Sequence, residues 1–256
     1  VVFHPAYHDL LQLGITSGYA ALPWLGAKGG HTTHAAMVYM QAGVEPGVSC
    51  PMTMTYAAVP ALKADPKIAA EWIPRLLSRQ YDPASRPAGE KNGATIGMAM
   101  TEKQGGSDVR ANSTRAVICD DGYRLNGHKW FCSAPMCDAF LTLAQTDDGL
   151  TCFLVPRWMP DGERNSLQIM RLKDKLGNKA NASSEIEYHD TFAWRLGEPG
   201  KGVKTIVEMV HHTRLDTALA PAGLMRAALA EAHWWVSGRS AFQRRLIDQP
   251  LMQSVL

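Results

Sequence analysis

The sequence predicts an α+β protein in which a helical segment is followed by a β domain and then by further helices. Three observations support this prediction. Apolar residues recur at helical spacing in the first third of the chain, short period-two apolar runs fill the middle, and helical spacing returns after Gly197. Many short strands without intervening helices are typical of antiparallel barrels and sandwiches, so we expect the middle domain to be one of these.

We expect three domains. Residues 1–92 form an N-terminal helical domain, residues 93–198 a β domain, and residues 199–256 the start of a C-terminal helical domain. The first boundary follows a polar stretch with Pro and Gly, and the second coincides with the change of period. The chain begins without Met and ends in an apolar helical pattern that has no stop signal. We therefore expect an internal fragment of a longer protein.

In the helical domain, Asp65 before Pro66 is a typical helix cap, and Thr32 or Thr33 can cap a helix over residues 34–41. Pro60 should kink or end the helix that Pro51 starts. Two histidine pairs have helical spacing, but no nearby Cys, Asp or Glu completes a metal-ligand set. We expect packing or surface histidines and no metal site; the pairs are His4/His8 and His31/His34.

The β domain contains five short runs that are typical of strands, and a hairpin turn over Asp147–Gly149 separates two of them. The runs are 113–118, 139–144, 150–155, 167–172 and 184–188. In the C-terminal part a long Ala-rich helix is expected over 203–236, kinked or split at Pro221, and another helix should begin near Pro250.

Charge and cysteine content limit the function classes. The chain has 26 Lys and Arg against 24 Asp and Glu, which argues against a generally basic nucleic-acid-binding protein. No apolar run approaches transmembrane length, and the N-terminus has no signal pattern, so we expect no membrane association. The five cysteines are scattered and form neither a disulfide framework nor a zinc motif, which favours a reducing, cytoplasmic location.

The stretch from Met98 to Asp108 is the first candidate ligand site. A short apolar run ends there in a turn with two adjacent glycines. Such a turn leaves backbone N–H groups unobstructed by Cβ atoms, so a flat or anionic ligand can approach the main chain. Thr101 and Ser107 add two hydroxyl groups. A polar turn without a ligand is the alternative for this stretch taken alone.

The stretch Gly127–Ala134 is the second candidate. It places Phe131 and Ser133 two residues apart, so the two side chains share one face if the segment is a strand. The alternative for Phe131 alone is an ordinary core aromatic. Two candidate stretches in one chain favour a ligand site more strongly than either stretch does by itself.

Together the two stretches resemble the flavin-binding signature of the acyl-CoA dehydrogenase superfamily. The likeness runs along essentially the whole chain and is closest to the bacterial adaptive-response flavoproteins of that superfamily. The order of helices, β domain and helices is also that of the acyl-CoA dehydrogenase fold. The segments that carry the likeness include Cys50-Pro51, Met54-Thr55, Thr101–Asp108, Arg171–Asn178, Asn181–Ser183 and Gln249–Met252.

The resemblance implies an FAD cofactor held by the β domain. Thr101 would donate a hydrogen bond to the flavin ring, Phe131 would cover the ring face, and Ser133 would hydrogen bond near N5. Arg239 would reach the FAD pyrophosphate of a neighbouring subunit, with a solvent-facing arginine as the alternative. The implied cofactor residues are Met98, Met100, Thr101, Gly106, Ser107, Phe131, Cys132, Ser133 and Arg239.

The implied substrate is an acyl-CoA or related thioester, with contacts from Ser107 and Arg214; a salt bridge within the helical bundle is the alternative for Arg214. Most members of the superfamily supply the catalytic Glu from a position beyond Leu256, and some supply it where this chain has Thr213. A threonine cannot act as the general base. No catalytic residue is therefore assigned, and residues 1–256 alone are expected to be inactive.

Three functional interpretations follow from the resemblance. The first is an FAD-dependent oxidoreductase that acts on the CH–CH group of an acyl thioester. The second is a DNA-associated flavoprotein of the alkylation-damage response with weak dehydrogenase activity, which would bind double-stranded DNA through its C-terminal domain. The third is a flavin-free structural relative. The resemblance also implies self-association, as a homotetramer.

Overall fold

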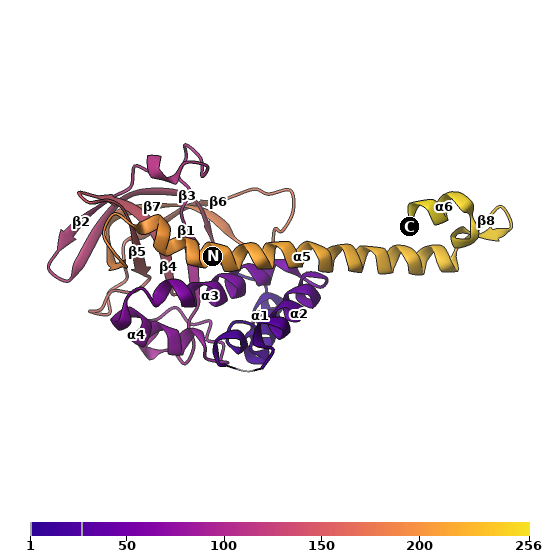
Figure 1. Cartoon of the computed structure of the whole chain (residues 1–256), viewed down its shortest axis with the longest axis horizontal. Helices are drawn as coiled ribbons and strands as arrows, with labels where there is room; N and C mark the ends of the chain where they lie inside the picture. Colours follow the sequence, from indigo (N-terminus) through magenta and orange to yellow (C-terminus); the bar gives the residue numbers. More distant parts are fainter. Residues whose placement is uncertain (1, 27) are drawn as a thin grey trace.

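A layer of helices, a β barrel and one long helix make up the fold (Figure 1). The computed structural model describes residues 2–26 and 28–256. Four helices come first, then seven strands, then the long helix α5 and a short terminal helix, which confirms the predicted α+β order. The helices are α1 (Pro5–Ser17), α2 (Gly30–Ala42), α3 (Ser49–Leu62), α4 (Pro66–Leu76), α5 (Gly202–Gly238) and α6 (Pro250–Val255).

Local sequence signals explain where several helices begin and end. The Asp65 side chain accepts hydrogen bonds from the N–H groups of Lys67 and Ile68, so the predicted cap of α4 is confirmed. Pro60 lies in the last turn of α3, which ends two residues later. The predicted start of α2 at residue 34 was wrong. That helix already begins at Gly30, and Thr33 is a helical residue whose hydroxyl donates to the Gly29 carbonyl.

Five strands close into a barrel in the order β4-β2-β3-β7-β5, because β5 also pairs with β4. The hairpin predicted at Asp147–Gly149 joins β4 to β5, with Thr146 opposite Gly149. Strand β1 pairs with residues 139–142 of β4, on the same edge that β2 meets at Gln145, and β6 lies beside β7. The strands are β1 (Ile96–Ala99), β2 (Arg115–Cys119), β3 (Gly122–Ser133), β4 (Ala139–Thr146), β5 (Gly149–Pro156), β6 (Leu167–Leu172) and β7 (Ser183–Leu196).

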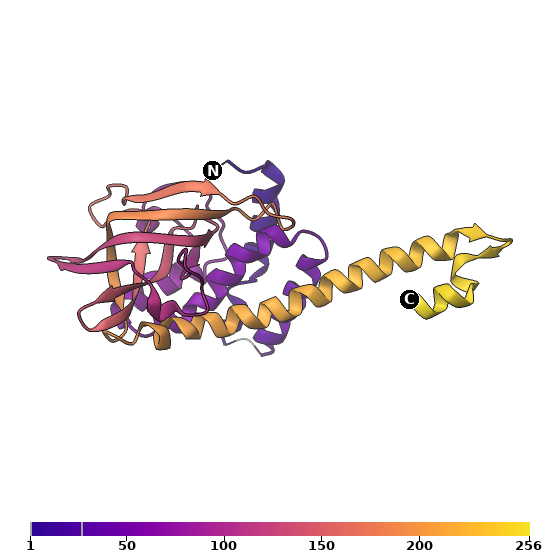
Figure 2. The ribbon, with the colours of Figure 1, turned by 90° about the horizontal axis from the view of Figure 1, so that it is seen from above.

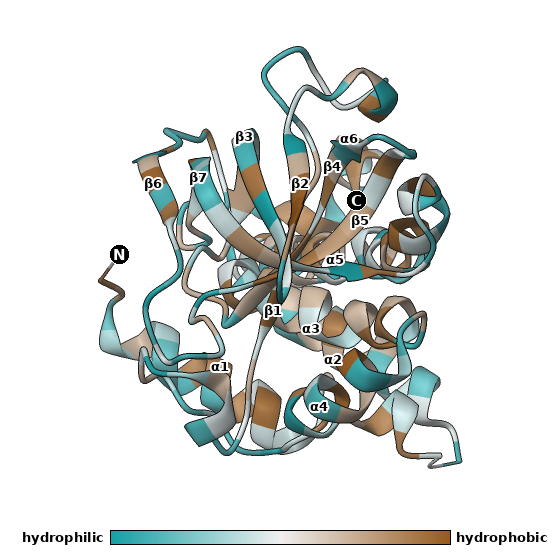
Figure 3. Cartoon of the chain, turned by 90° about the vertical axis from the view of Figure 1, so that its left-hand side faces the viewer, coloured by the Kyte–Doolittle hydropathy of each residue, from teal (hydrophilic) through white to brown (hydrophobic). Residues whose placement is uncertain are grey.

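The barrel is not entirely antiparallel. Strand β1 runs parallel to β4, and β2 meets β4 in parallel at a single residue pair. The β2–β3 hairpin lies between β1 and β4 in the sequence, so β4 can return alongside β1 in the same direction. In Figure 3 the strands carry several brown, apolar segments, and their lower ends lie next to the helical layer. The principal core cluster joins the barrel interior to α3, α4 and the start of α5.

Helix α5 connects the layers. It runs along the barrel and the helical layer and then projects beyond both, ending in a small hairpin and α6 (Figure 2). A kink or a split was predicted at Pro221, and the split is wrong, because α5 is continuous from Gly202 to Gly238. Proline removes only one backbone donor and disturbs one turn. Packing of α5 against α2 and α3 stabilises the helix around that turn.

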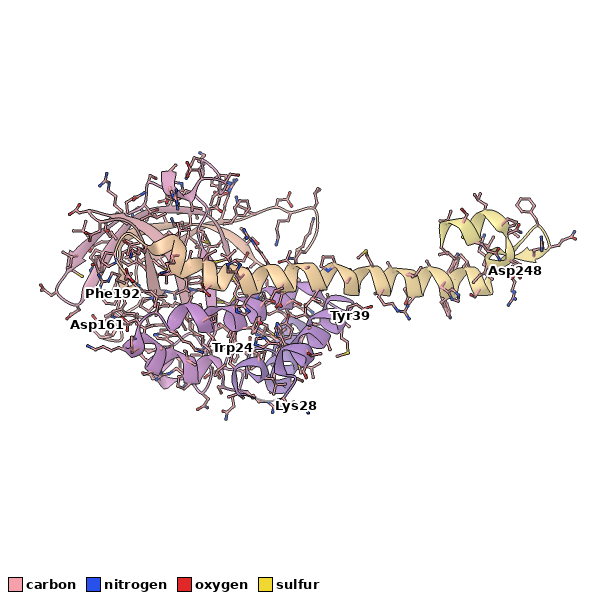
Figure 4. The ribbon with its side chains drawn as sticks, viewed as in Figure 1. Trp24, Lys28, Tyr39, Asp161, Phe192 and Asp248 are labelled. Carbon is pink, nitrogen blue, oxygen red and sulfur yellow. The ribbon has the colours of Figure 1, made fainter. Side chains whose placement is uncertain are left out.

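The backbones of α2 and α5 approach each other most closely at Gly223. A Cβ atom at this residue would lie 2.1 Å from the carbonyl oxygen of Tyr39, a residue of α2 that Figure 4 labels. The neighbouring atom belongs to the backbone and cannot rotate away. Although alanine is intrinsically better than glycine in a helix by about 1 kcal/mol, the two helices have no room for a methyl group here.

We expect Gly223→Ala to lower the free energy of unfolding by about 1–3 kcal/mol, the usual cost of overpacking. Gly238→Ala is the matched control, because a Cβ atom at the end of the same helix meets nothing within 4 Å. Urea denaturation of both variants measures the effect. A Gly223→Ala protein as stable as the control would contradict this packing of α2 on α5.

Candidate functional site

A cleft of about 580 Å³ lies where the barrel, α3 and α5 meet. One wall comes from the barrel and the other from the helices, and the lining is mostly apolar. The lining residues are Tyr19, Val38, Pro46, Ser49, Cys50, Thr53, Met54, Met98, Met100, Thr101, Gly106, Val109, Phe131, Ser133, Asn178, Val210, Thr213, Asp216, Thr217, Ala220, Pro221 and Leu224.

The barrel wall brings together six residues that the sequence predicted as cofactor contacts. They come from β1, the turn after it and the end of β3, and they are Met98, Met100, Thr101, Gly106, Phe131 and Ser133. The Trp130 N–H donates to the Thr101 carbonyl at 2.7 Å, which ties the end of β1 to β3. The Phe131 ring is 48% exposed, so it is a cleft residue and not the core aromatic of the alternative reading.

The hydroxyl groups of this wall are available to a ligand. A Cβ atom at Gly106 would lie 2.7 Å from the Thr101 hydroxyl oxygen, so only glycine lets the turn approach Thr101 this closely. The Thr101 hydroxyl has no hydrogen-bond partner within residues 2–26 and 28–256. The Ser133 hydroxyl lies 3.2 Å from that of Ser183, and since only one of the two can donate in that bond, the other retains its donor.

The turn that carries Thr101 and Gly106 is fixed by Glu102, a residue to which the sequence assigned no role. Glu102 is fully buried, and its carboxylate accepts from Lys129 Nζ at 2.8 Å and from the backbone N–H groups of Ser113 and Thr114. Lys129 also donates to the Leu143 carbonyl at 2.8 Å. Burial by itself raises the pKa of Glu102, but these hydrogen bonds outweigh it and lower that pKa to about 2. Glu102 is therefore an ionised anchor for the turn.

Four other predicted site residues lie away from the cleft lining. Ser107 is exposed on the turn, and the Cys132 side chain points into the barrel core, where burial raises the pKa of its thiol. Arg214 is exposed on α5 and makes no ion pair with the residues that the structure describes. Arg239 follows α5 at its far end, where its carbonyl accepts from the Leu246 N–H at 2.8 Å. Their assignment to cofactor or substrate stays a prediction.

The helix wall contains a buried carboxylate that the sequence reasoning left without a role. Asp216 is 3% exposed; its Oδ1 lies 2.9 Å from His34 Nε2, and its Oδ2 accepts from the Thr53 hydroxyl at 2.6 Å. His34 was predicted as a packing or surface residue; it is buried, and it joins α2 to α5. Residues 34 and 216 are far apart in sequence. The one signal that could have suggested the pair is a charged residue on the apolar face of a predicted helix.

Metal binding and membrane crossing find no support in the residues that the structure describes. Within residues 2–26 and 28–256, no three side chains of His, Cys, Asp or Glu gather in a way that could hold a metal ion. Among the same residues, no helix is both long enough and apolar enough to cross a membrane.

Three protein-family profiles match successive parts of the chain. The adaptive response protein AidB N-terminal domain matches residues 1–83, the acyl-CoA dehydrogenase middle domain matches residues 97–191, and the acyl-CoA dehydrogenase C-terminal domain matches residues 200–256. The order of the matches follows the helical, β and helical parts of the structure.

Individual relatives agree with the profiles. The chain is 48% identical over 260 residues to AidB of Escherichia coli, covering 100% of this chain and 48% of that protein. It is 38% identical over 226 residues to acyl-CoA dehydrogenase family member 11 of Caenorhabditis elegans, covering 82% of this chain and 35% of the relative. The chain thus spans about half the length, or less, of these curated relatives.

Solved structures of acyl-CoA dehydrogenases also resemble this chain. The crystal structure of Caenorhabditis elegans ACDH-11 in complex with C11-CoA superposes with a TM-score of 0.88 at 32% identity, covering 99% of this chain and 44% of that one. Butyryl-CoA dehydrogenase from Megasphaera elsdenii superposes with a TM-score of 0.77 at 22% identity, covering 99% of this chain and 66% of that one. The second likeness concerns the fold alone.

Proposed function

The chain belongs to the acyl-CoA dehydrogenase family, and we propose that the whole protein is an FAD-dependent oxidoreductase that oxidises the CH–CH group of an acyl thioester. One observation carries the proposal. The cleft unites six predicted flavin contacts of the barrel with α3 and α5 in a single, mostly apolar space. The complex of a 32% identical relative with C11-CoA supports an acyl-CoA as the substrate class.

The barrel wall fits a flat ring with polar edges. Met98, Met100 and Phe131 offer apolar surface, and Thr101 and Ser133 offer hydroxyl groups next to it. Thr101 has no competing partner within the described ranges, and its hydroxyl is free to donate to an acceptor on the ring edge. When bound, FAD supplies the acceptor for the hydride that leaves the substrate.

The chain's own residues would position the acyl group and exclude water from it. Phe131 forms an apolar face of the cleft, and the Lys173 ammonium lies 4.4 Å from its ring centroid. Proton abstraction is not assigned to any described residue. Thr213 lines the cleft but cannot act as a base, and both carboxylate oxygens of Asp216 already take part in hydrogen bonds.

Anaerobic reduction tests the proposed function. We expect the purified whole protein to show flavin absorbance, and we expect at least one acyl-CoA of a panel of chain lengths to bleach it. Whole protein that carries no flavin, even after reconstitution, would overturn the cofactor assignment. A flavin that no acyl-CoA reduces would overturn the reaction.

We expect Thr101→Ala and Ser133→Ala each to weaken FAD binding by about 1 kcal/mol, or about fivefold, because each removes one hydrogen bond. The Tm of the apoprotein should not change by more than a degree or two. Thr16→Ala, which removes an exposed hydroxyl on α1, is the control. FAD affinity is measured by titrating the apoprotein; unchanged affinity in the double variant would show that these hydroxyls do not face the cofactor.

Self-association as a homotetramer, a cytoplasmic location and a role in the DNA alkylation response remain proposals for the whole protein. The similarity to AidB motivates the last of them. The net charge of +2 gives no sign of a DNA-binding surface.

A further inference from the structure

The helix wall of the cleft carries a hydrogen-bond network in which nearly all donors are already used. The groups that remain available to a ligand are therefore mostly acceptors. The Thr53 hydroxyl donates to Asp216 Oδ2 at 2.6 Å, so its single proton is used. The Tyr19 hydroxyl lies 3.1 Å from the Thr53 oxygen and must therefore donate to it. Tyr19, Thr53 and Asp216 all line the cleft, and each retains unused lone pairs.

His34 contributes no spare donor either. Its Nδ1 lies 2.7 Å from the Tyr19 carbonyl, an acceptor only, so Nδ1 carries a proton. Its Nε2 lies 2.9 Å from Asp216 Oδ1, and one proton lies between these two atoms. Whichever atom carries that proton, His34 and Asp216 together have no net charge. The buried pair therefore offers a ligand lone pairs and no uncompensated charge.

The threonines on either side of Asp216 use their donors within α5. The Thr213 hydroxyl donates to the Val210 carbonyl at 2.9 Å, and the Thr217 hydroxyl donates to the Thr213 carbonyl at 2.7 Å. Both threonines line the cleft. A ligand that reaches this wall meets several oxygen acceptors and few donors.

Ser49 is the exception, because its hydroxyl is an unused donor on the same helix wall. It is 8% exposed and lines the cleft one helical turn before Thr53 on α3. Its hydroxyl is next to that of Tyr19 but has no partner of hydrogen-bonding geometry within residues 2–26 and 28–256. An unpaired buried hydroxyl costs free energy, which a ligand that hydrogen bonds to it removes.

We propose that this wall selects an acyl group that carries a neutral hydroxyl, with Asp216 and Ser49 as specificity-determining residues. The inference rests on the proposed function, since the substrate is taken to be an acyl thioester. A hydroxyl can donate to Asp216 and also accept from Ser49. An ammonium group cannot accept a hydrogen bond, and the neutral His34–Asp216 pair gives it no net charge to bind. A plain alkyl chain leaves the Ser49 hydroxyl without a partner.

The probes are three CoA thioesters of equal acyl length that end in a hydroxyl, an ammonium or a methyl group. Each thioester is tested on the whole protein at several acyl chain lengths. Direct binding to the protein is measured by calorimetry, and flavin reduction is followed in parallel. We expect the hydroxyacyl-CoA to bind at least tenfold more tightly than the other two at the best chain length.

Two variants assign the effect to the helix wall. Ser49→Ala removes only an unpaired hydroxyl, so the Tm should not fall, and the preference for the hydroxyacyl-CoA should fall about three- to tenfold. Asp216→Asn introduces donors among acceptors, and the preference should fall by about tenfold or more. Ser240→Ala, at the far end of the chain, should change nothing.

The possible outcomes separate the two proposals. A hydroxyl preference that both variants reduce supports the inference. Acyl-CoAs that bind or reduce the flavin without any hydroxyl preference, or with a preference that survives in Ser49→Ala and Asp216→Asn, overturn the inference and leave the proposed function standing. If no acyl-CoA binds at all, the proposed function fails and the inference fails with it.

Discussion

Replacing Lys129 by Met will lower the free energy of unfolding by about 3–5 kcal/mol, because it leaves the buried Glu102 carboxylate without its cation. Both side chains are 0% exposed and lie 2.8 Å apart. Within residues 2–26 and 28–256, no cation other than Lys129 forms an ion pair with Glu102. Urea denaturation measures the loss, and the turn that holds Thr101 should become more accessible to protease.

Replacing both partners should be far less costly than replacing one. In the Lys129→Met/Glu102→Leu double variant no buried charge remains, so most of the stability should return. Lys201→Met is the matched control, since Lys201 pairs with Glu198 at 2.7 Å but the side chains are 58% and 67% exposed. That exposed pair should contribute less than about 1 kcal/mol. Equal losses of stability in Lys129→Met and Lys201→Met would refute the role of burial.

Acid sensitivity is a second measurement on the same pair. The folded state holds the pKa of Glu102 at about 2, against about 4.3 in an unfolded chain. The unfolded state therefore binds the proton more readily, and the stabilisation is fully present only above the unfolded value. It is lost as the pH falls from about 4.3 toward 2. Glu102→Gln should flatten this part of the stability-against-pH curve.

The order of the elements could be predicted from sequence because each element has a local signal. Asp65 before Pro66 fixes a helix start by side-chain capping, and the turn at Asp147–Gly149 fixes a hairpin. The continuity of α5 through Pro221 could not be predicted in this way. It depends on packing against α2 and α3, which no window of sequence contains.

In the candidate site, too, features with a local sequence signal were predictable and features that depend on packing were not. The barrel wall was predictable, because Thr101 and Gly106 belong to one short stretch and Phe131 and Ser133 to another. The helix wall was not, since His34 and Asp216 are joined only by the packing of α2 on α5. The inward orientation of Cys132, in contrast, follows from a local rule. Successive side chains of a strand alternate between its two faces, so Cys132 lies on the face opposite to Phe131.

Replacing His34 by Leu should lower the free energy of unfolding by about 3–5 kcal/mol. His34 donates to the Tyr19 carbonyl at 2.7 Å and bonds to Asp216 at 2.9 Å, so leucine leaves two buried acceptors without their donor. Thr53 alone cannot satisfy the Asp216 carboxylate. The loss should appear in urea denaturation.

Three further variants separate a buried pair from a histidine that merely fills space. His34→Gln retains a side-chain donor and should lose less stability than His34→Leu. The His34→Leu/Asp216→Leu double variant removes both polar groups and should be more stable than His34→Leu alone. His189→Leu is the control, because His189 and Glu187 also lie 2.9 Å apart but are 55% and 40% exposed. If His34→Leu is no more costly than this control, the pair does not hold α2 to α5, and the cleft must be stabilised by apolar packing alone.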